Sequence, residues 1–206
     1  MLDIASYQSA EVEPEAPGAE AAAAGVFDRG IAFSILAKAL SEQAARGGSL
    51  AGRLGLTHAE LLEFAAFCGW TGLERCEGKR GDEVVPEEQA WVRDLLRRHA
   101  EPGSRLAAAL APIVARRAME ANHLWEDLGL DSRGALTRLM QRHFGPLARL
   151  NTDNMRWKRF LYRRLCEEEG VMHCTSPTCS ICPDVDACFE DGSLERAIAV
   201  GKQAPR

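Results

Sequence analysis

A run of four cysteines near the C-terminus constrains this chain most: Cys174, Cys179, Cys182 and Cys188. They follow the spacing C-x4-C-x2-C-x5-C, in a stretch that has two prolines and no apolar periodicity. Such a stretch cannot bury a hydrophobic core of its own. Four thiolates that converge on one point can instead bind a metal, and soft sulfur ligands select zinc, cuprous copper or iron–sulfur clusters. The segment therefore predicts a metal or cluster site.

Three interpretations of these cysteines compete. Disulfides are typical of small secreted chains, but the cysteine count of seven is odd and the N-terminus lacks the basic and apolar regions of a secretory signal. Structural zinc sites usually pair two Cys-x2-Cys or Cys/His knuckles across a longer loop, and only one C-x2-C is present here. The spacing is closer to the closely packed runs that ligate cubane clusters. It favours a cluster and leaves zinc open.

Basic residues dominate the region just before the cysteines. Residues 133–164 carry nine Lys or Arg and one acid, whereas residues 165–190 carry six acids and no Lys or Arg. A basic run can be a solvated helix face, can neutralise nucleic-acid phosphates, or can attract small oxyanions or an acidic protein by electrostatic focusing. The net charge of −5 and the lack of a DNA-binding motif argue against nucleic acid. Arg156, Lys158 and Arg159 are our candidates for an anion-attracting or partner-binding surface.

The rest of the chain predicts helices. Residues 1–26 are rich in Ala, Glu, Pro and Gly, with five acids and no Lys or Arg, which predicts a disordered tail. No apolar run approaches the ~18–20 residues that a bilayer-spanning helix needs, so we expect no membrane association. Strand alternation and internal repeats are not recognisable. The predicted fold is all-α: a single helical domain over residues 27–170, then a cysteine-rich cluster-binding loop and C-terminal tail over residues 171–206.

Capping and breaking signals predict the helix boundaries. Thr57 and Glu60 form a capping box. Pro112 should break a helix or start a new one, because proline lacks the N–H donor and clashes with the preceding turn. The expected helices begin near Asp28, Thr57, Pro86, Ser104, Ser132 (or Asp131) and Thr152 (or Asp153).

The last long helix delivers the cysteine run. Trp157, Phe160, Leu161 and Leu165 lie at offsets of zero, three, four and eight, which places them on one helical face. An apolar stripe of this kind packs on a core. We therefore expect these four residues to anchor the helix, with the loop after it starting from a fixed point.

The stretch from His123 to Phe189 resembles a known family. It contains WEDLGL, MRWK and the gap-free four-cysteine run ending in CF, and these motifs are similar to those of NifQ, a family that acts in assembling the iron–molybdenum cofactor of nitrogenase. The resemblance is weaker over residues 27–122, where it is one of length and helical character. The N-terminal tail contributes nothing to it.

The resemblance implies a carrier of an iron–sulfur/molybdenum cluster that donates molybdenum, and not an enzyme. Its ligands would be Cys174, Cys179, Cys182 and Cys188. The cluster would be of the 4Fe–4S type or the molybdenum-containing Mo–3Fe–4S type. The implied partners are the NifEN scaffold, the iron protein NifH, and molybdate or another molybdenum donor. We expect a cytoplasmic location.

A second set of residues comprises accessory candidates. The candidates are Cys166, His173, His123 and His143. Cys166 fits a small buried hydrophobe better than a spare ligand. His173 directly precedes the first cysteine, while His123 and His143 are core groups or aids to molybdate entry. Cys68 and Cys76 are distant in sequence and carry no assigned role.

Two other function classes stay open. One is an iron–sulfur redox or oxygen-sensing module, and the other is a zinc-stabilised interaction protein. The sequence contains no nucleophile elbow, Walker loop or paired carboxylates that would indicate an enzyme. Glu126 and Asp127 are adjacent acids, but neighbouring helical residues do not face each other. We expect these two to be surface or supporting groups.

Overall fold

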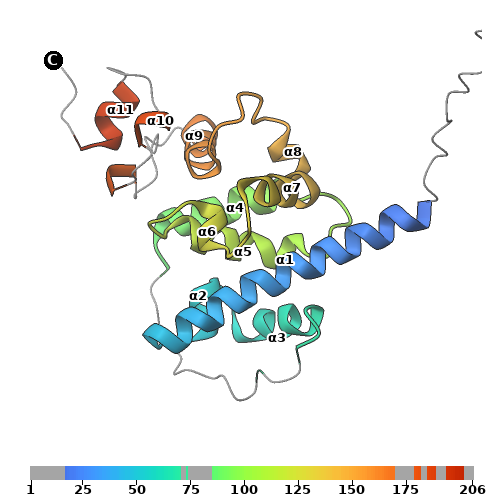
Figure 1. The fold of residues 1–206 in the computed structure, drawn as a ribbon. Coiled ribbons are helices and arrows are strands. Elements are labelled where there is room, and N and C mark those ends of the chain that lie inside the picture. The colour runs from blue at the N-terminus through green and yellow to red at the C-terminus, as the bar shows by residue number, and fades with distance from the viewer. Residues whose placement is uncertain are drawn as a thin grey trace, which may run out of the picture.

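The computed structural model describes residues 17–70, 73, 85–169, 179–181, 185–188 and 194–201. Every regular element in these ranges is a helix, so the predicted all-α fold is confirmed (Figure 1). None of the helices described is both long enough and apolar enough to cross a membrane. The elements are α1 (Pro17–Arg46), α2 (Leu50–Leu54), α3 (His58–Phe67), α4 (Glu87–Arg98), α5 (Ala107–Ala118), α6 (Leu124–Asp127), α7 (Arg133–His143), α8 (Gly145–Ala148), α9 (Trp157–Glu169), the 3-10 helix η2 (Cys179–Ile181), α10 (Val185–Cys188) and α11 (Leu194–Ala199).

Helix α1 crosses the helical body, with α3 on one side and the group from α4 to α8 on the other (Figure 1). Helix α2 packs against α1, α3 and α5. Helix α4 packs along α5, and α9 packs against α4. The C-terminal elements η2, α10 and α11 lie beyond α9 (Figure 1). Helix α9 therefore stands between the body and the segment that carries the cysteines.

Helix α1 begins earlier than the sequence predicted. Residues 17–26 are helical, although they were expected to belong to a disordered tail, and residues 1–16 lie outside the described ranges. The physical reason is local, because this stretch contains four consecutive alanines, the best helix formers. Pro17 stands at the start of the helix, where proline is tolerated.

Two predicted helix starts are confirmed by their caps. Thr57 Oγ1 accepts a hydrogen bond from Glu60 N at 3.2 Å, and Thr57 N donates to Glu60 Oε2 at 2.7 Å. These two bonds form the capping box. Ser132 Oγ accepts from Ala135 N at 3.1 Å and caps α7. Both caps satisfy backbone donors that a helix start leaves without partners.

The prediction that Pro112 ends or starts a helix was wrong. Pro112 lies inside α5, with its ring buried in the core. The backbone bond that it removes would have ended on the carbonyl of Ala108. Ala108 is exposed, so water can satisfy that carbonyl. Apolar packing of the proline ring therefore outweighs the lost hydrogen bond.

Helix α9 begins at Trp157, later than the predicted start at Thr152 or Asp153. A side-chain turn delays it: Met155 N donates to Asn151 Oδ1 at 2.8 Å, and Asn151 Nδ2 donates to Met155 O at 3.0 Å. Asn154 has a φ of 48°, which is not helical.

The predicted anchoring stripe of α9 is confirmed. Trp157, Phe160, Leu161 and Leu165 are all buried within the hydrophobic core. The rings of Trp157 and Phe160 meet edge to face with centroids 5.7 Å apart, and Trp157 Nε1 donates to Thr137 Oγ1 at 3.2 Å. The indole ring of Trp157 thus has an aromatic packing partner and its N–H has a hydrogen-bond acceptor. These contacts hold the first turn of α9 in place.

Candidate metal centre and its pocket

Two of the four predicted cluster ligands lie in described elements. Cys179 is the first residue of η2, Cys188 is the last residue of α10, and both are half-buried. Cys174, Cys182 and His173 lie outside the described residues. Within the described ranges no group of three or more potential ligands converges, and these ranges contain only half of the thiolate set.

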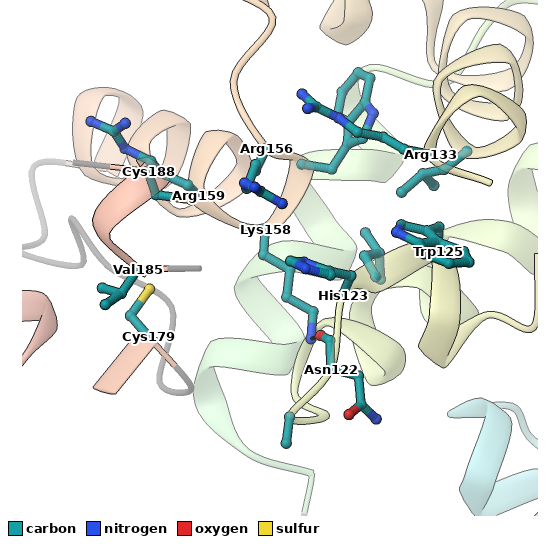
Figure 2. A pocket seen from close by; sticks show the side chains of 14 residues that line it. Asn122, His123, Trp125, Arg133, Arg156, Lys158, Arg159, Cys179, Val185 and Cys188 are labelled. Atoms are coloured by element: carbon teal, nitrogen blue, oxygen red, sulfur yellow. Dashed lines mark hydrogen bonds between the residues drawn. The ribbon is translucent and has the colours of Figure 1, made fainter. Parts of the chain in front are cut away.

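Cys179 and Cys188 face one pocket of about 70 Å³ (Figure 2). Four parts of the chain form its wall: the C-terminal segment, the start of α9, the first half of α7, and α6 with the turn that leads into it. The predicted residues that line it are Cys179, Cys188, His123, Arg156, Lys158 and Arg159. Residues far apart in sequence therefore meet beside the two thiols. These soft donors at a shared pocket fit a thiolate-bound cluster.

The pocket is positively charged. Four basic residues line it: Arg133, Arg156, Lys158 and Arg159. Among the described residues of its wall there is no Asp or Glu. The wall also includes the first turn of α9, the positive end of the helix dipole. A small anion is the ligand that this electrostatic environment favours.

Lys158 has a structural task within this wall. Its ammonium lies 3.0 Å from Asp127 Oδ2 and donates to the carbonyl oxygens of Glu120 at 2.5 Å and Asn122 at 2.6 Å. These contacts use all three donors of a lysine. The side chain is 12% exposed and that of Asp127 is 3% exposed. Lys158 thus ties α9 to the turn before α6.

Of the two roles expected for Asp127, surface residue or supporting group, the structure gives it the second, and it is buried at 2% exposure. It accepts hydrogen bonds from Lys158 and, at 2.9 Å, from Asn122 Nδ2. Glu126 is also a supporting group, because its Oε2 accepts from His123 N at 2.9 Å. Asp127 pairs with a lysine 31 residues away, so no local pattern announced its burial.

The two candidate histidines are separated by the fold. His123 precedes α6 and lines the pocket. His143 ends α7 inside the body, where its Nδ1 lies 2.8 Å from Ser104 Oγ and its Nε2 lies 3.2 Å from Asp28 Oδ1. Burial lowers the pKa of His143, and the charge of Asp28 offsets this only in part. His143 is a buried core group and does not line the pocket.

The other described cysteines do not line this pocket. Cys166 is half-buried on α9, and Cys68 caps the end of α3. Burial raises the pKa of the Cys68 thiol to about 11, so Cys68 is protonated at neutral pH and is a poor metal ligand. Cys76 lies outside the described residues.

Trp125 and Arg133 are two of the wall residues that the sequence did not single out. Trp125 contributes an aromatic surface, and Arg133 reaches the pocket from the start of α7. Arg133 Nη2 donates to Asn154 O at 2.7 Å, which holds its guanidinium near the start of α9. Both residues belong to the segment that carries the family motifs, but nothing in their local spacing distinguishes them from surface residues.

The fold and the pocket define a helical protein with a cysteine-rich candidate metal centre at its C-terminal end. The NifQ family profile matches residues 33–190, which include most of the body and all four predicted ligands. The chain therefore belongs to the NifQ family.

Individual relatives agree with this. The chain is 41% identical over 179 residues to a protein NifQ homolog of Sinorhizobium fredii, an alignment that covers 85% of this chain and 77% of that protein. It is 41% identical over 156 residues to protein NifQ of Rhodobacter capsulatus, covering 75% and 86%. It is also 41% identical over 113 residues to protein NifQ of Azotobacter vinelandii, covering 55% and 47%. No solved structure matches the chain. The resemblance seen in the motifs is confirmed.

Proposed function

We propose that this protein carries an iron–sulfur cluster and supplies molybdenum for assembly of the nitrogenase iron–molybdenum cofactor. Membership of the NifQ family supports a role in this assembly and in nitrogen fixation. One structural observation supports the finer proposal: Cys179 and Cys188, from two separate short helices, line the same positively charged pocket. The protein acts as a carrier and donor in the cytoplasm, and not as an enzyme.

The cargo is held by the thiolates of Cys174, Cys179, Cys182 and Cys188. Thiolates are the usual ligands of a cubane cluster, here of the 4Fe–4S or Mo–3Fe–4S type, and its bridging sulfides suit molybdenum once it has been reduced. Cys179 and Cys188 lie in helices of three and four residues. Such short elements gain little stability from their own hydrogen bonds. This supports a site that can release its cargo as well as hold it.

Transfer requires partners. We propose the NifEN scaffold and the iron protein NifH as recipients, and molybdate or a molybdenum donor as the source. The half-buried Arg156 and Arg159 lie beside Cys179 and Cys188. Their positive charge suits an acidic docking surface or an incoming oxyanion.

Metal analysis of single-cysteine variants tests the ligand assignment. Protein purified without oxygen from cells supplied with molybdate is analysed for iron, sulfide and molybdenum and by electron paramagnetic resonance. Replacing any of Cys174, Cys179, Cys182 or Cys188 by Ala should abolish cluster binding and leave the far-ultraviolet circular dichroism of the body unchanged.

Matched controls come from the other described cysteines. Cys68→Ala and Cys166→Ala should keep the iron content of the wild type, because neither residue lines the pocket. Full iron content in two of the four ligand variants would contradict the assignment. Zinc alone in the wild type, with no iron even after anaerobic reconstitution, would contradict the proposed function.

A further inference from the structure

Helix α1 has two apolar faces. One face is buried in the core, through residues such as Ile31, Ile35 and Leu36. The opposite face carries an apolar row in which Leu40 is half-buried and the other members are exposed: Val26, Gly30, Phe33, Ala37, Leu40 and Ala44. Val26 is 63% exposed and Phe33 is 59% exposed. A surface helix normally presents polar residues to solvent, so an apolar row on this face is suited to contact with another molecule.

The row has the spacing of a coiled-coil seam. Its members alternate in steps of four and three residues from Val26 to Ala44, and this spacing keeps a seam on one side of a helix that packs along a second helix. The larger side chains, Val26, Phe33 and Leu40, recur every seven residues, and each is followed by a small one. Alternation of large and small residues is the pattern that lets two facing rows interdigitate.

Gly30 gives an independent indication that something packs on this face. Glycine in the interior of a helix is destabilising relative to alanine. A Cβ placed on Gly30 would meet no atom of a neighbouring element within 4 Å. The described part of the chain therefore supplies no packing reason for a glycine here. Close approach by a group from outside the chain supplies one.

The row is complementary to itself when two copies of α1 run antiparallel. With a two-fold axis beside position 35, each large side chain faces a small residue of the other copy: Phe33 faces Ala37, Leu40 faces Gly30, and Val26 faces Ala44. In a parallel pair each residue would face its own counterpart, so large side chains would collide and small ones would leave gaps. Two-fold pairing of identical surfaces is the commonest symmetry of protein dimers. The antiparallel second copy is thus the occupant that the row fits.

Charge and area are compatible with this pairing. Arg29 is exposed beside the row, and in the antiparallel pair it faces the uncharged Ser41 of the other copy. The macrodipoles of two antiparallel helices also attract each other. From Val26 to Ala44 the row covers about 28 Å of helix. Two such faces bury on the order of 1,000 Å² in total, which lies at the low end for specific interfaces and predicts a weak dimer with a micromolar Kd.

We infer that the solvent face of α1 is a dimerisation surface, on which α1 of a second copy of this chain docks antiparallel. None of the residues that line the pocket of Cys179 and Cys188 belongs to α1, so the pairing leaves that pocket accessible. The inference does not depend on the proposed function, because it involves neither the cysteines nor molybdenum.

Sedimentation equilibrium of the full-length protein, from low to high micromolar concentration, measures the pairing. A reducing agent is present throughout, so that disulfides between copies cannot form. The mass of the wild type should rise with concentration from that of the 22.5 kDa monomer towards twice that value. Phe33→Glu places a charge at the centre of the row and should raise the Kd at least about tenfold. A wild type that stays monomeric would overturn the inference and leave the face to residues 1–16 or to a different protein.

Phe67→Glu is the matched control. It makes the same change at another exposed phenylalanine, which is 37% exposed and lies on α3 outside the row. Its Kd should equal that of the wild type. Circular dichroism of each variant verifies that the helical fold is retained. Equal dissociation constants of Phe33→Glu and the wild type would also overturn the inference.

A pair of compensating variants tests the antiparallel arrangement. Ala37→Phe brings a second ring against Phe33 of the other copy and should raise the Kd at least about tenfold, because overpacking is destabilising. The double variant Phe33→Ala/Ala37→Phe exchanges the large and small partners and should return the Kd to within about threefold of the wild type. A double variant that dimerises no better than Ala37→Phe would overturn the antiparallel pairing.

Discussion

The helical body and the C-terminal segment are built by different forces. In the body, large apolar side chains from Ile31 on α1 to Leu165 on α9 form one buried cluster. In the described part of the C-terminal segment, from Cys179 to Gly201, the one buried hydrophobic residue is Ala199. An alanine buries little apolar surface, and burial of apolar surface is the main favourable term in folding.

This difference indicates where a bound cluster supplies stability. The body has enough apolar burial to fold without metal. The segment has the cysteines and an ion pair between Arg196 and Asp186, and exposed ion pairs contribute little. Under the proposed function, coordination of the cluster adds order to this segment, because binding energy to a site absent from the unfolded chain acts as folding energy. The comparison predicts that the two regions respond differently to substitution, pH and metal removal.

Phe160→Ala should have the largest effect on the body. Phe160 is 2% exposed and packs against Trp157, so its truncation leaves a cavity. The free energy of unfolding should fall by about 3–5 kcal/mol, measured by urea denaturation. Leu62→Ala is the control, because Leu62 is 40% exposed, and it should cost less than about 1 kcal/mol. Equal losses in the two variants would contradict the described core.

Asp127→Ala tests the junction between the two regions. It leaves the partly buried ammonium of Lys158 without its counter-charge, and the free energy of unfolding should fall by about 3 kcal/mol. Glu167→Gln, which weakens the surface pairs with Arg163 and Arg164, should change the stability by about 0–1 kcal/mol. An unchanged free energy of unfolding in Asp127→Ala would show that the Lys158–Asp127 pair does not organise the pocket.

Acidification should weaken the body through Asp28 and His143. Burial lowers the pKa of His143 from its ordinary value of 6.5, with the charge of Asp28 opposing. The unfolded chain therefore takes up a proton on His143 before the folded chain does, and stability falls as the pH drops below 6.5.

Asp28 adds a second loss at lower pH. Burial raises the pKa of Asp28, but the hydrogen bond from Arg142 and the charges of His143 and Arg142 outweigh burial. The pKa of Asp28 therefore lies below its ordinary value of 3.8. The stability that Asp28 contributes is present above that value and is lost as the pH falls through the folded pKa.

Urea midpoints between pH 7.5 and pH 5 test the contribution of His143. They should decline in the wild type and less in His143→Gln. Identical pH profiles would remove His143 from this role.

Metal removal should have the smallest effect on the body and thereby sharpens the comparison most. Chelation of the metal cluster, or Cys179→Ser, should change the unfolding free energy of the body by no more than about 0.5 kcal/mol. The reason is that the hydrophobic core contains neither Cys179 nor Cys188. Protease digestion should cut the C-terminal segment sooner. A large fall in the unfolding free energy of the body would show that the metal site is part of the hydrophobic core.

Much of the fold and part of the site could be predicted from local sequence. The Thr57 capping box, the start of α7 at Ser132 and the buried stripe of α9 depend on residues a few positions apart, and their physics is local. The start of α1 differs from the prediction because four consecutive alanines favour a helix there although the stretch has little apolar surface to bury. Pro112 was misassigned because its packing in the core depends on helices that are distant in sequence.

The sequence by itself determined the helical class, most caps and the set of candidate ligands, because these follow from spacing and side-chain chemistry. Only the tertiary structure decided which residues meet. It brought His123 and Arg156 to the pocket of Cys179 and Cys188, assigned Lys158 to the buried Asp127, and placed His143 in the core. The physical reason is that long-range contacts are selected by the packing of whole helices, and no local pattern encodes which faces will oppose each other.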